Sequence, residues 1–311
     1  MHAYIESVGS YIPERVMTND ELAEMVDTSN EWIVSHTGIR ERHIAAEDEK
    51  TSDLAVMAAE KALESSSVSA EDIDLIIVAT STPDFVGFPS TAAIVQDRLG
   101  ASNAGAMDLT AACTGFIYGL ETARAFVESG SAATVMVIGS EVLSRIIDWT
   151  DRNTCVLFGD GAGAVIVNRS AEHGPSRIAH GFLKSQGSGA EYLYVDTAIR
   201  MNGRQVYSFA VKALCDTVDD LLRDIPDGRE KIRFVVPHQA NVRIITAAGR
   251  RMNLPDELFY TNMDRFANTS AASIPLALDE IARKDLLERG DLILTIGFGG
   301  GLTYGGNLIY W

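Results

Sequence analysis

The chain has 311 residues, of which 46% are hydrophobic and 22% charged, so its composition is that of a globular protein and excludes disorder, collagen and coiled coil. The formal net charge of −17 argues against nucleic acid and an anionic membrane face as partners, because an acidic surface repels phosphate. With no apolar run long enough to span a membrane, no secretory signal at the start and only three widely spaced cysteines, we expect a cytoplasmic protein without disulfides.

In chain order, helical and strand patterns alternate. The amphipathic patterns predict helices over residues 53–65, 89–100, 115–130, 208–224, 239–252 and 270–284. The continuously apolar runs predict strands over residues 75–81, 134–140, 164–168, 233–238 and 291–297. Strands of this kind are covered on both faces, so the order predicts an α/β fold with largely parallel sheets.

Two strand positions recur at one offset along the chain. VATS at 78–81 lies 158 residues before VPHQ at 236–239, and MVIG at 136–139 lies the same distance before LTIG at 294–297. A constant offset indicates a duplicated unit. We therefore predict two halves fused face to face, with boundaries at residues 1–172 and 173–311.

Cys113 follows an apolar stretch and precedes a helical one, in the segment DLTAACTGF at 108–116. At such an elbow, the unpaired N–H groups and the dipole of the following helix favour a thiolate, the nucleophilic form of cysteine. The flanking small residues leave room for a substrate near the backbone. The alternative is a small core residue among alanines, the interpretation that we prefer for Cys155 and Cys215.

Two polar residues stand at helix and strand ends in the second half. His238 ends a predicted strand, at the sheet edge where α/β proteins bind ligands, and the alternative is a structural histidine. Asn268 precedes a helix, so it is either an amide donor in a site or an N-cap. The offset of 158 relates residue 113 to residue 271, close to Asn268, so two equivalent helix starts are expected to face each other.

Two glycine-rich segments and one basic segment remain. The G-x-G-x-x-A pattern at 159–164 precedes a strand instead of a helix, which excludes a dinucleotide fingerprint. The turn FGGGLTYGG at 298–306 is either a tight strand connection or a source of N–H groups for an oxyanion hole. Residues 223–251 carry seven basic and three acidic side chains, so they are either a solvated face or a site for an acidic partner or a phosphate. No metal-ligand motif is present, and we expect no metal.

Four motifs together resemble those of β-ketoacyl-acyl-carrier-protein synthase III. They are AACTGF around Cys113, PHQAN around His238, NTSAAS from Asn268 and the terminal FGGGLTYG. The similarity continues, in order, through NEWIVSHTGIRER (30–42), GFPST (87–91), DRNTCVLFGDGAGA (151–164) and MNGRQVY (201–207). The resemblance implies a homodimer with a thiolase-like fold, in which a duplicated unit forms five αβαβα layers with two mixed, mainly parallel sheets.

The resemblance also implies an acyltransferase that initiates fatty-acid biosynthesis. Such an enzyme condenses an acyl-coenzyme A primer with malonyl-acyl-carrier protein, releases carbon dioxide and yields a β-ketoacyl-acyl-carrier protein through an acyl-cysteine. No cofactor is implied, because the coenzyme A thioester is a substrate. The alternative on the same scaffold is a specialised acyltransferase or condensing enzyme of secondary metabolism.

By this resemblance, Cys113 is the acylated nucleophile, and the N–H groups of Cys113 and Gly300 form the oxyanion hole. His238 and Asn268 donate hydrogen bonds to the malonyl thioester carbonyl, where decarboxylation develops negative charge. The other implied residues are Thr28, Trp32, Arg152, Asn241 and Tyr207 for coenzyme A, Phe88, Leu143, Phe158 and Phe298 for the acyl pocket, and Arg243, Arg250 and Arg251 for the carrier protein. Phe88 is expected to reach the acyl pocket of the partner subunit.

Three positions depart from the family's pattern: His36 stands for an arginine, Tyr207 for a phenylalanine and Ser208 for a basic residue. They leave open whether coenzyme A or a carrier protein holds the acyl donor. Two functions outside the family fit the sequence less well. The chain order Cys-His-Asn occurs in papain-like proteases, but those are secreted chains with disulfides. A non-catalytic scaffold has no structural need for the complete set of cysteine, histidine and asparagine.

Overall fold

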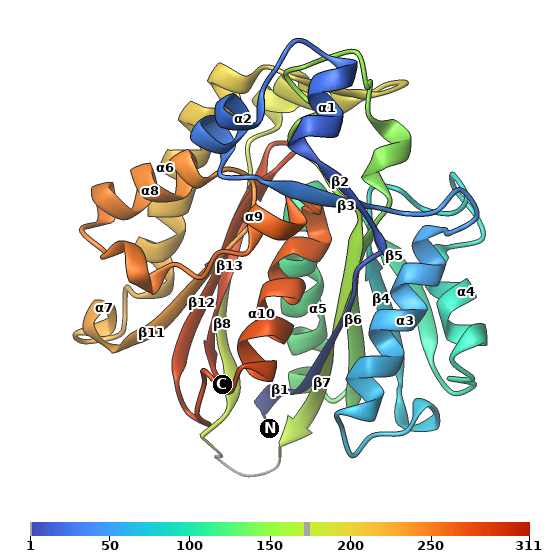
Figure 1. Cartoon of the computed structure of the whole chain (residues 1–311). Helices are drawn as coiled ribbons and strands as arrows, with labels where there is room; N and C mark the ends of the chain where they lie inside the picture. Colours follow the sequence, from blue (N-terminus) through green and yellow to red (C-terminus); the bar gives the residue numbers. More distant parts are fainter. Residues whose placement is uncertain (1, 171–174) are drawn as a thin grey trace.

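Two β-sheets form the centre of the computed structural model, which describes residues 2–170 and 175–311 (Figure 1). The first sheet has five strands, in the order β1 (His2–Tyr11), β7 (Gly161–Ser170), β6 (Thr134–Glu141), β4 (Leu75–Ala79) and β5 (Gly105–Leu109). The second has four, in the order β11 (Ile232–Pro237), β12 (Leu292–Gly299), β13 (Thr303–Tyr310) and β8 (Arg177–Ser185). The predicted boundary between residues 172 and 173 lies outside the described residues.

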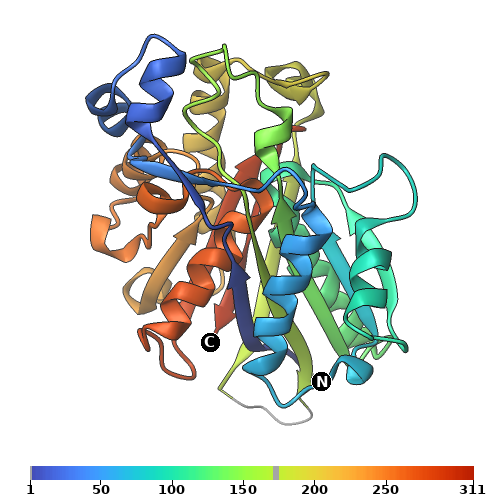
Figure 2. The same ribbon diagram turned by 45° about the vertical axis from the view of Figure 1, so that its right-hand side comes forward.

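Helices separate the two sheets and cover their outer faces (Figures 1 and 2). Between the sheets lie α5 (Gly115–Ser129) and α10 (Ser273–Arg283), which contact strands of both. The outer face of the first sheet is covered by α3 (Thr51–Glu64) and α4 (Thr91–Arg98). The second sheet is covered by α6 (Gly203–Leu221), against which α8 (Val242–Met252) packs. The predicted five αβαβα layers are therefore confirmed.

Both sheets are mixed, as expected, but they are not mainly parallel, which corrects that part of the prediction. Neighbouring strands run parallel in the pairs β4–β5, β4–β6 and β11–β12. They run antiparallel in the pairs β1–β7, β6–β7, β12–β13 and β8–β13. The strands β1, β8 and β13 were not predicted, because half-exposed, polar or glycine residues interrupt their apolar pattern.

The offset of 158 residues relates structural elements as well as sequence. β6 corresponds at this offset to β12, and the first residue of α5, Gly115, corresponds to Ser273 at the start of α10. A 3₁₀ turn precedes each helix, at Ala112–Thr114 and at Ser270–Ala272, and the two turns contact each other. The first residue of each turn has a positive φ, 47° at Ala112 and 49° at Ser270. The duplication thus brings two equivalent strained turns together.

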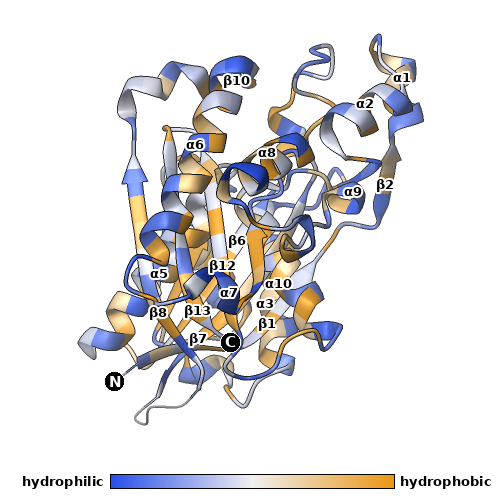
Figure 3. Cartoon of the chain, turned by 90° about the vertical axis from the view of Figure 1, so that its left-hand side faces the viewer, coloured by the Kyte–Doolittle hydropathy of each residue, from blue (hydrophilic) through white to orange (hydrophobic). Residues whose placement is uncertain are grey.

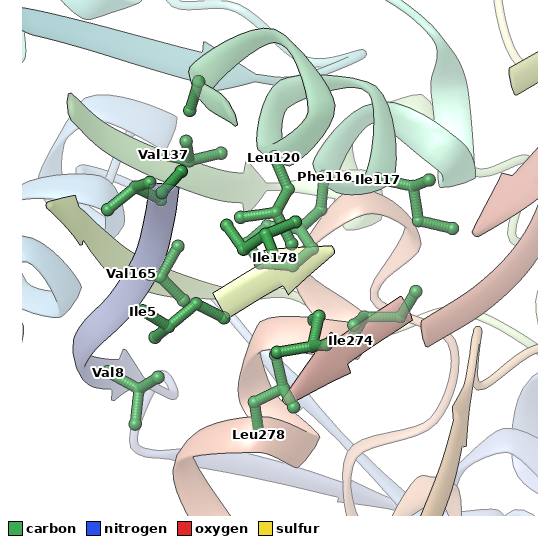
Figure 4. Close-up of a cluster of buried hydrophobic side chains, with 14 of the residues drawn as sticks. Ile5, Val8, Phe116, Ile117, Leu120, Val137, Val165, Ile178, Ile274 and Leu278 are labelled. Carbon is green, nitrogen blue, oxygen red and sulfur yellow. The ribbon is translucent and has the colours of Figure 1, made fainter. Parts of the chain in front are cut away.

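An apolar cluster fills the space between the two sheets and fixes both central helices. Figure 4 shows side chains of α5 and α10 meeting strand residues there, among them Phe116, Ile117, Leu120, Ile274, Leu278, Ile5, Val8, Val137, Val165 and Ile178. Burial of apolar surface contributes about 25 cal/mol per Å². The cluster therefore holds the helix starts, and with them the turn that carries Cys113, in a fixed position.

Smaller elements cover the end of the molecule that lies opposite the two termini (Figure 1). They include β2 (Arg15–Thr18), α1 (Asn19–Met25), α2 (Asn30–Thr37), β3 (Glu41–Ile44) and the hairpin of β9 (Leu193–Val195) and β10 (Ile199–Met201). In Figure 3, hydrophobic residues follow the strands, whereas the surface helix α7 (Gly228–Lys231) is polar. Among the described residues, no helix has the length and apolar character needed to cross a membrane.

Candidate active site

Cys113 lies in the strained turn that connects β5 to α5, at the elbow that the sequence predicts. The preceding Ala112 has the left-handed φ noted above, a conformation that costs a non-glycine residue about 1–3 kcal/mol. The hydroxyl of Thr114 lies 2.7 Å from Ala111 O and 2.8 Å from Thr303 Oγ1, which ties the turn to β13. The surrounding structure thus holds the thiol in one place, with 8% of the residue exposed.

Burial opposes the thiolate that the helix start is expected to favour. Burial raises the pKa of Cys113 to about 12, and a hydrogen bond from Ser270 only partly offsets this effect. Deprotonation of Cys113 must therefore accompany the reaction.

His238 follows β11 at the predicted sheet edge, and it is buried. Its Nδ1 lies 2.7 Å from Ser273 Oγ, and its ring packs edge-on against Phe298 with 5.6 Å between the ring centroids. Burial lowers the pKa of His238 to about 3, so the ring is neutral. Ser273 Oγ also accepts from Gln239 N–H at 3.4 Å, and its own hydrogen can be donated to Nδ1; in that tautomer the ring proton is on Nε2, which is then a donor.

Asn268 precedes the second strained turn, and its amide group is oriented by that turn. Its Oδ1 accepts a hydrogen bond from Ser270 N–H at 2.8 Å. Its backbone N–H donates to Leu157 O at 2.9 Å, which fixes Asn268 against the loop that precedes β7. The Nδ2 group has no acceptor among the described residues, so it is free to donate. Asn268 therefore caps the 3₁₀ turn with its oxygen, as in an Asx turn, and the same bond leaves its amide nitrogen without an acceptor.

Two cavities meet at Cys113. The first, of about 500 Å³, is lined by Cys113, His238 and Asn268 together with residues of α2, α6 and α8. The second, of about 400 Å³, is mostly apolar and is lined by Cys113, Leu143, Phe158 and Gly300. The three residues that the sequence singled out thus border one space, and the thiol alone of the three also borders the other.

The glycine-rich turn after β12 packs directly against the nucleophile. A Cβ atom on Gly299 would lie 2.8 Å from the Cys113 backbone nitrogen, a distance that real contacts do not allow. Neither the Cys113 N–H nor the Gly300 N–H donates to another described residue. Two backbone donors are therefore free beside the thiol, as an oxyanion hole requires.

We expect Gly299→Ala to lower the turnover number by about 10²-fold, because the added methyl displaces the Cys113 backbone and its donor. Steady-state kinetics checks this, and Gly187→Ala is the matched control, since a Cβ on Gly187 would have no neighbour within 4 Å. Equal activity of the two variants would contradict the role given to this turn.

Several of the residues implied for coenzyme A lie around the first cavity. Trp32, Asn241 and Tyr207 line it. Arg152 is stacked over Trp32, with 4.9 Å between its guanidinium carbon and the ring centroid, and the ring of His36 is stacked on the same indole at 4.3 Å. Thr28 lines neither cavity, and its buried hydroxyl has no hydrogen-bond partner among the described residues.

The residues implied for the acyl pocket separate into three positions. Leu143 and Phe158 line the second, apolar cavity, and Phe158 also lines the first. Phe298 lines the first cavity instead, against His238. Phe88 lies in an exposed loop with 88% of its surface accessible, so the chain by itself does not bring it into either cavity.

Only some of the basic side chains in the segment 223–251 remain unpaired in the structure. Arg223, Arg229 and Arg233 form ion pairs with neighbouring aspartates, and Lys231 donates to a carbonyl. The three arginines of α8 are left exposed: Arg243, Arg250 and Arg251. Arg243 lines the mouth of the first cavity and donates to Ser35 O at 3.2 Å.

Among the residues that border the site, Asn153, Arg204, Leu193 and Ser270 were not predicted from the sequence. Arg204 is exposed in the first turn of α6. It lies three residues before Tyr207, so the expected position of Tyr207 at the site could have indicated that Arg204 borders the site as well. Ser270 belongs to NTSAAS, where only the asparagine was considered. No cluster of three potential metal ligands occurs among the described residues.

Comparison with known proteins gives a consistent result along the whole chain. Residues 107–187 match the family model of 3-oxoacyl-[acyl-carrier-protein (ACP)] synthase III, and residues 228–311 match the model of its C-terminal region. The beta-ketoacyl-[acyl-carrier-protein] synthase III of Xanthomonas euvesicatoria is 49% identical over 99% of this chain and 98% of its own length.

Two solved structures extend the comparison to three dimensions. The 3-oxoacyl-[acyl-carrier-protein] synthase III of Aquifex aeolicus has a TM-score of 0.96 and 46% identity, over 99% of this chain and 100% of that one. The priming beta-ketosynthase of the R1128 polyketide biosynthetic pathway has a TM-score of 0.93 and 36% identity, over 99% of this chain and 96% of that one.

Proposed function

Since this chain belongs to the 3-oxoacyl-[acyl-carrier-protein] synthase III family, we propose that Cys113, His238 and Asn268 carry out the reaction of that family. The protein is a condensing acyltransferase of the type that initiates fatty-acid biosynthesis. The observation that supports these roles is that a buried thiol and two neutral hydrogen-bond donors line one cavity.

In the first half of the reaction, Cys113 attacks the thioester carbonyl of an acyl-coenzyme A. The carbonyl oxygen becomes an oxyanion between the N–H groups of Cys113 and Gly300. The acyl chain enters the apolar cavity that Leu143 and Phe158 line, and the coenzyme A thiol leaves through the first cavity. Exchange of one thioester for another conserves the bond energy, so the step needs no cofactor.

In the second half, the malonyl thioester of an acyl-carrier protein occupies the first cavity. His238 Nε2–H and Asn268 Nδ2–H donate to its carbonyl oxygen, which gains negative charge as carbon dioxide leaves. Two fixed donors stabilise this transition state more than the ground state. The resulting enolate carbon attacks the acyl group on Cys113, giving a β-ketoacyl-acyl-carrier protein and free thiol.

The test follows the enzyme's intact mass after mixing with acetyl-, isobutyryl- or octanoyl-coenzyme A, and then with malonyl-acyl-carrier protein. The expected result is an adduct on Cys113 that disappears as β-ketoacyl-carrier protein forms, and the adduct that forms fastest identifies the primer. Absence of any adduct would contradict the role of Cys113.

The second candidate function is that of a condensing enzyme of secondary metabolism, which the likeness to the R1128 priming beta-ketosynthase favours. Under this alternative, the same experiment gives an adduct on Cys113 that malonyl-acyl-carrier protein does not consume. A different acceptor would then have to be found.

The carrier protein is proposed to dock on α8, where three arginines are exposed in a chain of charge −17 and one of them, Arg243, lines the first cavity. We expect the double variant Arg250→Glu and Arg251→Glu to raise the KM for malonyl-acyl-carrier protein about tenfold, more at low salt, because charges at the rim of an interface mainly control association. The KM for acyl-coenzyme A should stay unchanged. Arg223→Glu, which lies outside α8, is the control and should leave both KM values unchanged. A similar rise for both substrates would contradict docking at α8.

We further propose a cytoplasmic homodimer. The exposed loop that carries Phe85, Val86 and Phe88 supports the dimer, because three large apolar side chains together on a surface mark an interaction site. Phe88 would then complete the apolar cavity of the partner subunit.

A further inference from the structure

The proposed oxyanion hole takes its two donors from different halves of the chain. The Cys113 N–H belongs to the turn before α5, and the Gly300 N–H belongs to the turn after β12. An oxyanion is stabilised by both donors only when both point at the position that it occupies. Because β5 lies in the first sheet and β12 in the second, no strand pairing fixes the geometry between the two turns. Other contacts must fix it.

Thr303, the first residue of β13, lies where the two turns meet. Its Oγ1 accepts a hydrogen bond from Thr114 Oγ1 at 2.8 Å. Its own hydrogen faces two acceptors, Gly300 O at 3.1 Å and Ala111 O at 3.2 Å. The hydroxyl of Thr303 therefore has partners in both turns, on either side of Cys113 in one and at Gly300 itself in the other.

The hydrogen bonds of Thr303 have no substitute at this junction. Within residues 2–170 and 175–311, they are the only hydrogen bonds that join segment 110–115 to segment 298–304. Ala111 O also accepts from the backbone and the hydroxyl of Thr114, at 3.2 and 2.7 Å. Gly300 O has no other donor in the described part of the chain. Loss of the Thr303 hydroxyl would therefore release mainly Gly300.

Gly300 needs such a contact because it is a glycine. Its carbonyl and its N–H belong to neighbouring peptide planes that share one Cα, and without a Cβ the rotation between them is little restricted. The close approach of Gly299 to the Cys113 backbone sets how near the turns come to each other. Packing of this kind has little directional preference, whereas a hydrogen bond to Gly300 O orients the residue.

We propose that Thr303 is a positioning residue of the oxyanion hole. Its hydroxyl holds Gly300 so that the Gly300 N–H and the Cys113 N–H point at the same carbonyl oxygen. Thr303 acts through Gly300 and not on the substrate. The proposal rests on the proposed function, because the hole serves acyl transfer to Cys113.

Two reactions of the same thiol distinguish this role from a purely structural one. Acyl transfer from acetyl-coenzyme A develops an oxyanion on the thioester carbonyl. Alkylation by iodoacetamide does not, because the sulfur displaces iodide at a saturated carbon and the thiol proton passes to water. A residue that positions the hole affects the first reaction alone, whereas a residue that supports the whole turn affects both.

The experiment measures acyl-Cys113 formation in single turnover, by rapid quench and intact mass, in wild type and in Thr303→Val. Valine keeps the shape of threonine and removes the hydroxyl. We expect the limiting rate to fall by about 10²-fold, the scale of loss for a reacting group that is misplaced by about 1 Å. The acetyl-coenzyme A concentration that gives half this rate should stay unchanged, and so should the rate of alkylation of Cys113 by iodoacetamide.

Two further variants serve as controls. Thr303→Ser restores the hydroxyl and should recover acylation close to the wild-type rate. Thr217→Val is the matched control, because Thr217 is also a buried threonine whose hydroxyl donates to a carbonyl, Ala213 O at 2.7 Å, and it lines neither cavity. Thermal unfolding shows that each variant is folded at the assay temperature, and Thr303→Ala replaces the valine variant if valine prevents folding.

The positioning role and the proposed function fail differently. Wild-type enzyme that forms no acyl-Cys113 would contradict the proposed function itself. Thr303→Val that acylates at the wild-type rate, or that loses acylation and alkylation equally, would overturn the positioning role alone. So would a Thr303→Ser variant that acylates as slowly as Thr303→Val.

Discussion

Replacing Cys113 by alanine is expected to abolish acyl transfer, by about 10⁶-fold, which is the scale of loss when a nucleophile is removed. No other cysteine can substitute, because Cys155 and Cys215 are both buried and line neither cavity at the nucleophile. The measurement is acyl-enzyme formation by intact mass, together with turnover of malonyl-acyl-carrier protein.

The fold should survive this substitution. The variant removes one buried sulfur next to a cavity, which changes the free energy of unfolding by about 1–2 kcal/mol. Thermal unfolding checks this, and Cys215→Ala is the matched control. It is expected to keep full activity, because Cys215 belongs to α6 and lies in the apolar cluster that α6 forms with α8. Condensation retained by the Cys113 variant would show that another group forms the covalent intermediate.

Replacing His238 or Asn268 by alanine is expected to lower condensation by about 10²–10³-fold each, the cost of one oxyanion donor. Acylation of Cys113 by acyl-coenzyme A should continue, because the oxyanion of that step is proposed to lie between the N–H groups of Cys113 and Gly300 instead. The double variant should lose less than the product of the two single losses, since both donors serve one oxygen.

The two half-reactions are measured separately to test this split. Intact mass follows the acyl-enzyme, and release of carbon dioxide follows the malonyl thioester. Asn268→Asp is the isosteric control, because it keeps the acceptor for Ser270 N–H but replaces the free amide donor by an oxygen. A variant of His238 that decarboxylates normally, or that cannot be acylated, would contradict the assignment.

The parts of the site that depend on local chain geometry were predictable from sequence. Cys113 and Asn268 lie next to helix starts and His238 lies at a strand end, and short segments of sequence specify such positions. The alternation of helices and strands predicted the α/β class and the repeat predicted two halves, whereas the five layers followed from the family resemblance alone. The mistaken preference for parallel strands arose because only strands buried on both faces carry a continuous apolar pattern.

The parts that depend on packing were not predictable. Thr303 belongs to FGGGLTYGG, and that segment gives no sign that the hydroxyl reaches Ala111 and Thr114. The state of the thiol has the same cause: the elbow favours a thiolate, but the packing of both halves around Cys113 removes the water that would stabilise one. Burial of a polar group is a property of the assembled fold and not of any one segment.

The two strained turns, at Ala112–Thr114 and Ser270–Ala272, can accumulate different amino-acid substitutions. In two separate identical subunits, any substitution in the turn appears twice, once on each side of the axis. Covalent fusion removes that constraint, because Ala112 and Ser270 occupy equivalent positions but are encoded independently. Cys113 and its counterpart Ala271 differ for the same reason. One copy of the turn can therefore keep the nucleophile while the other is free to acquire polar groups that serve it.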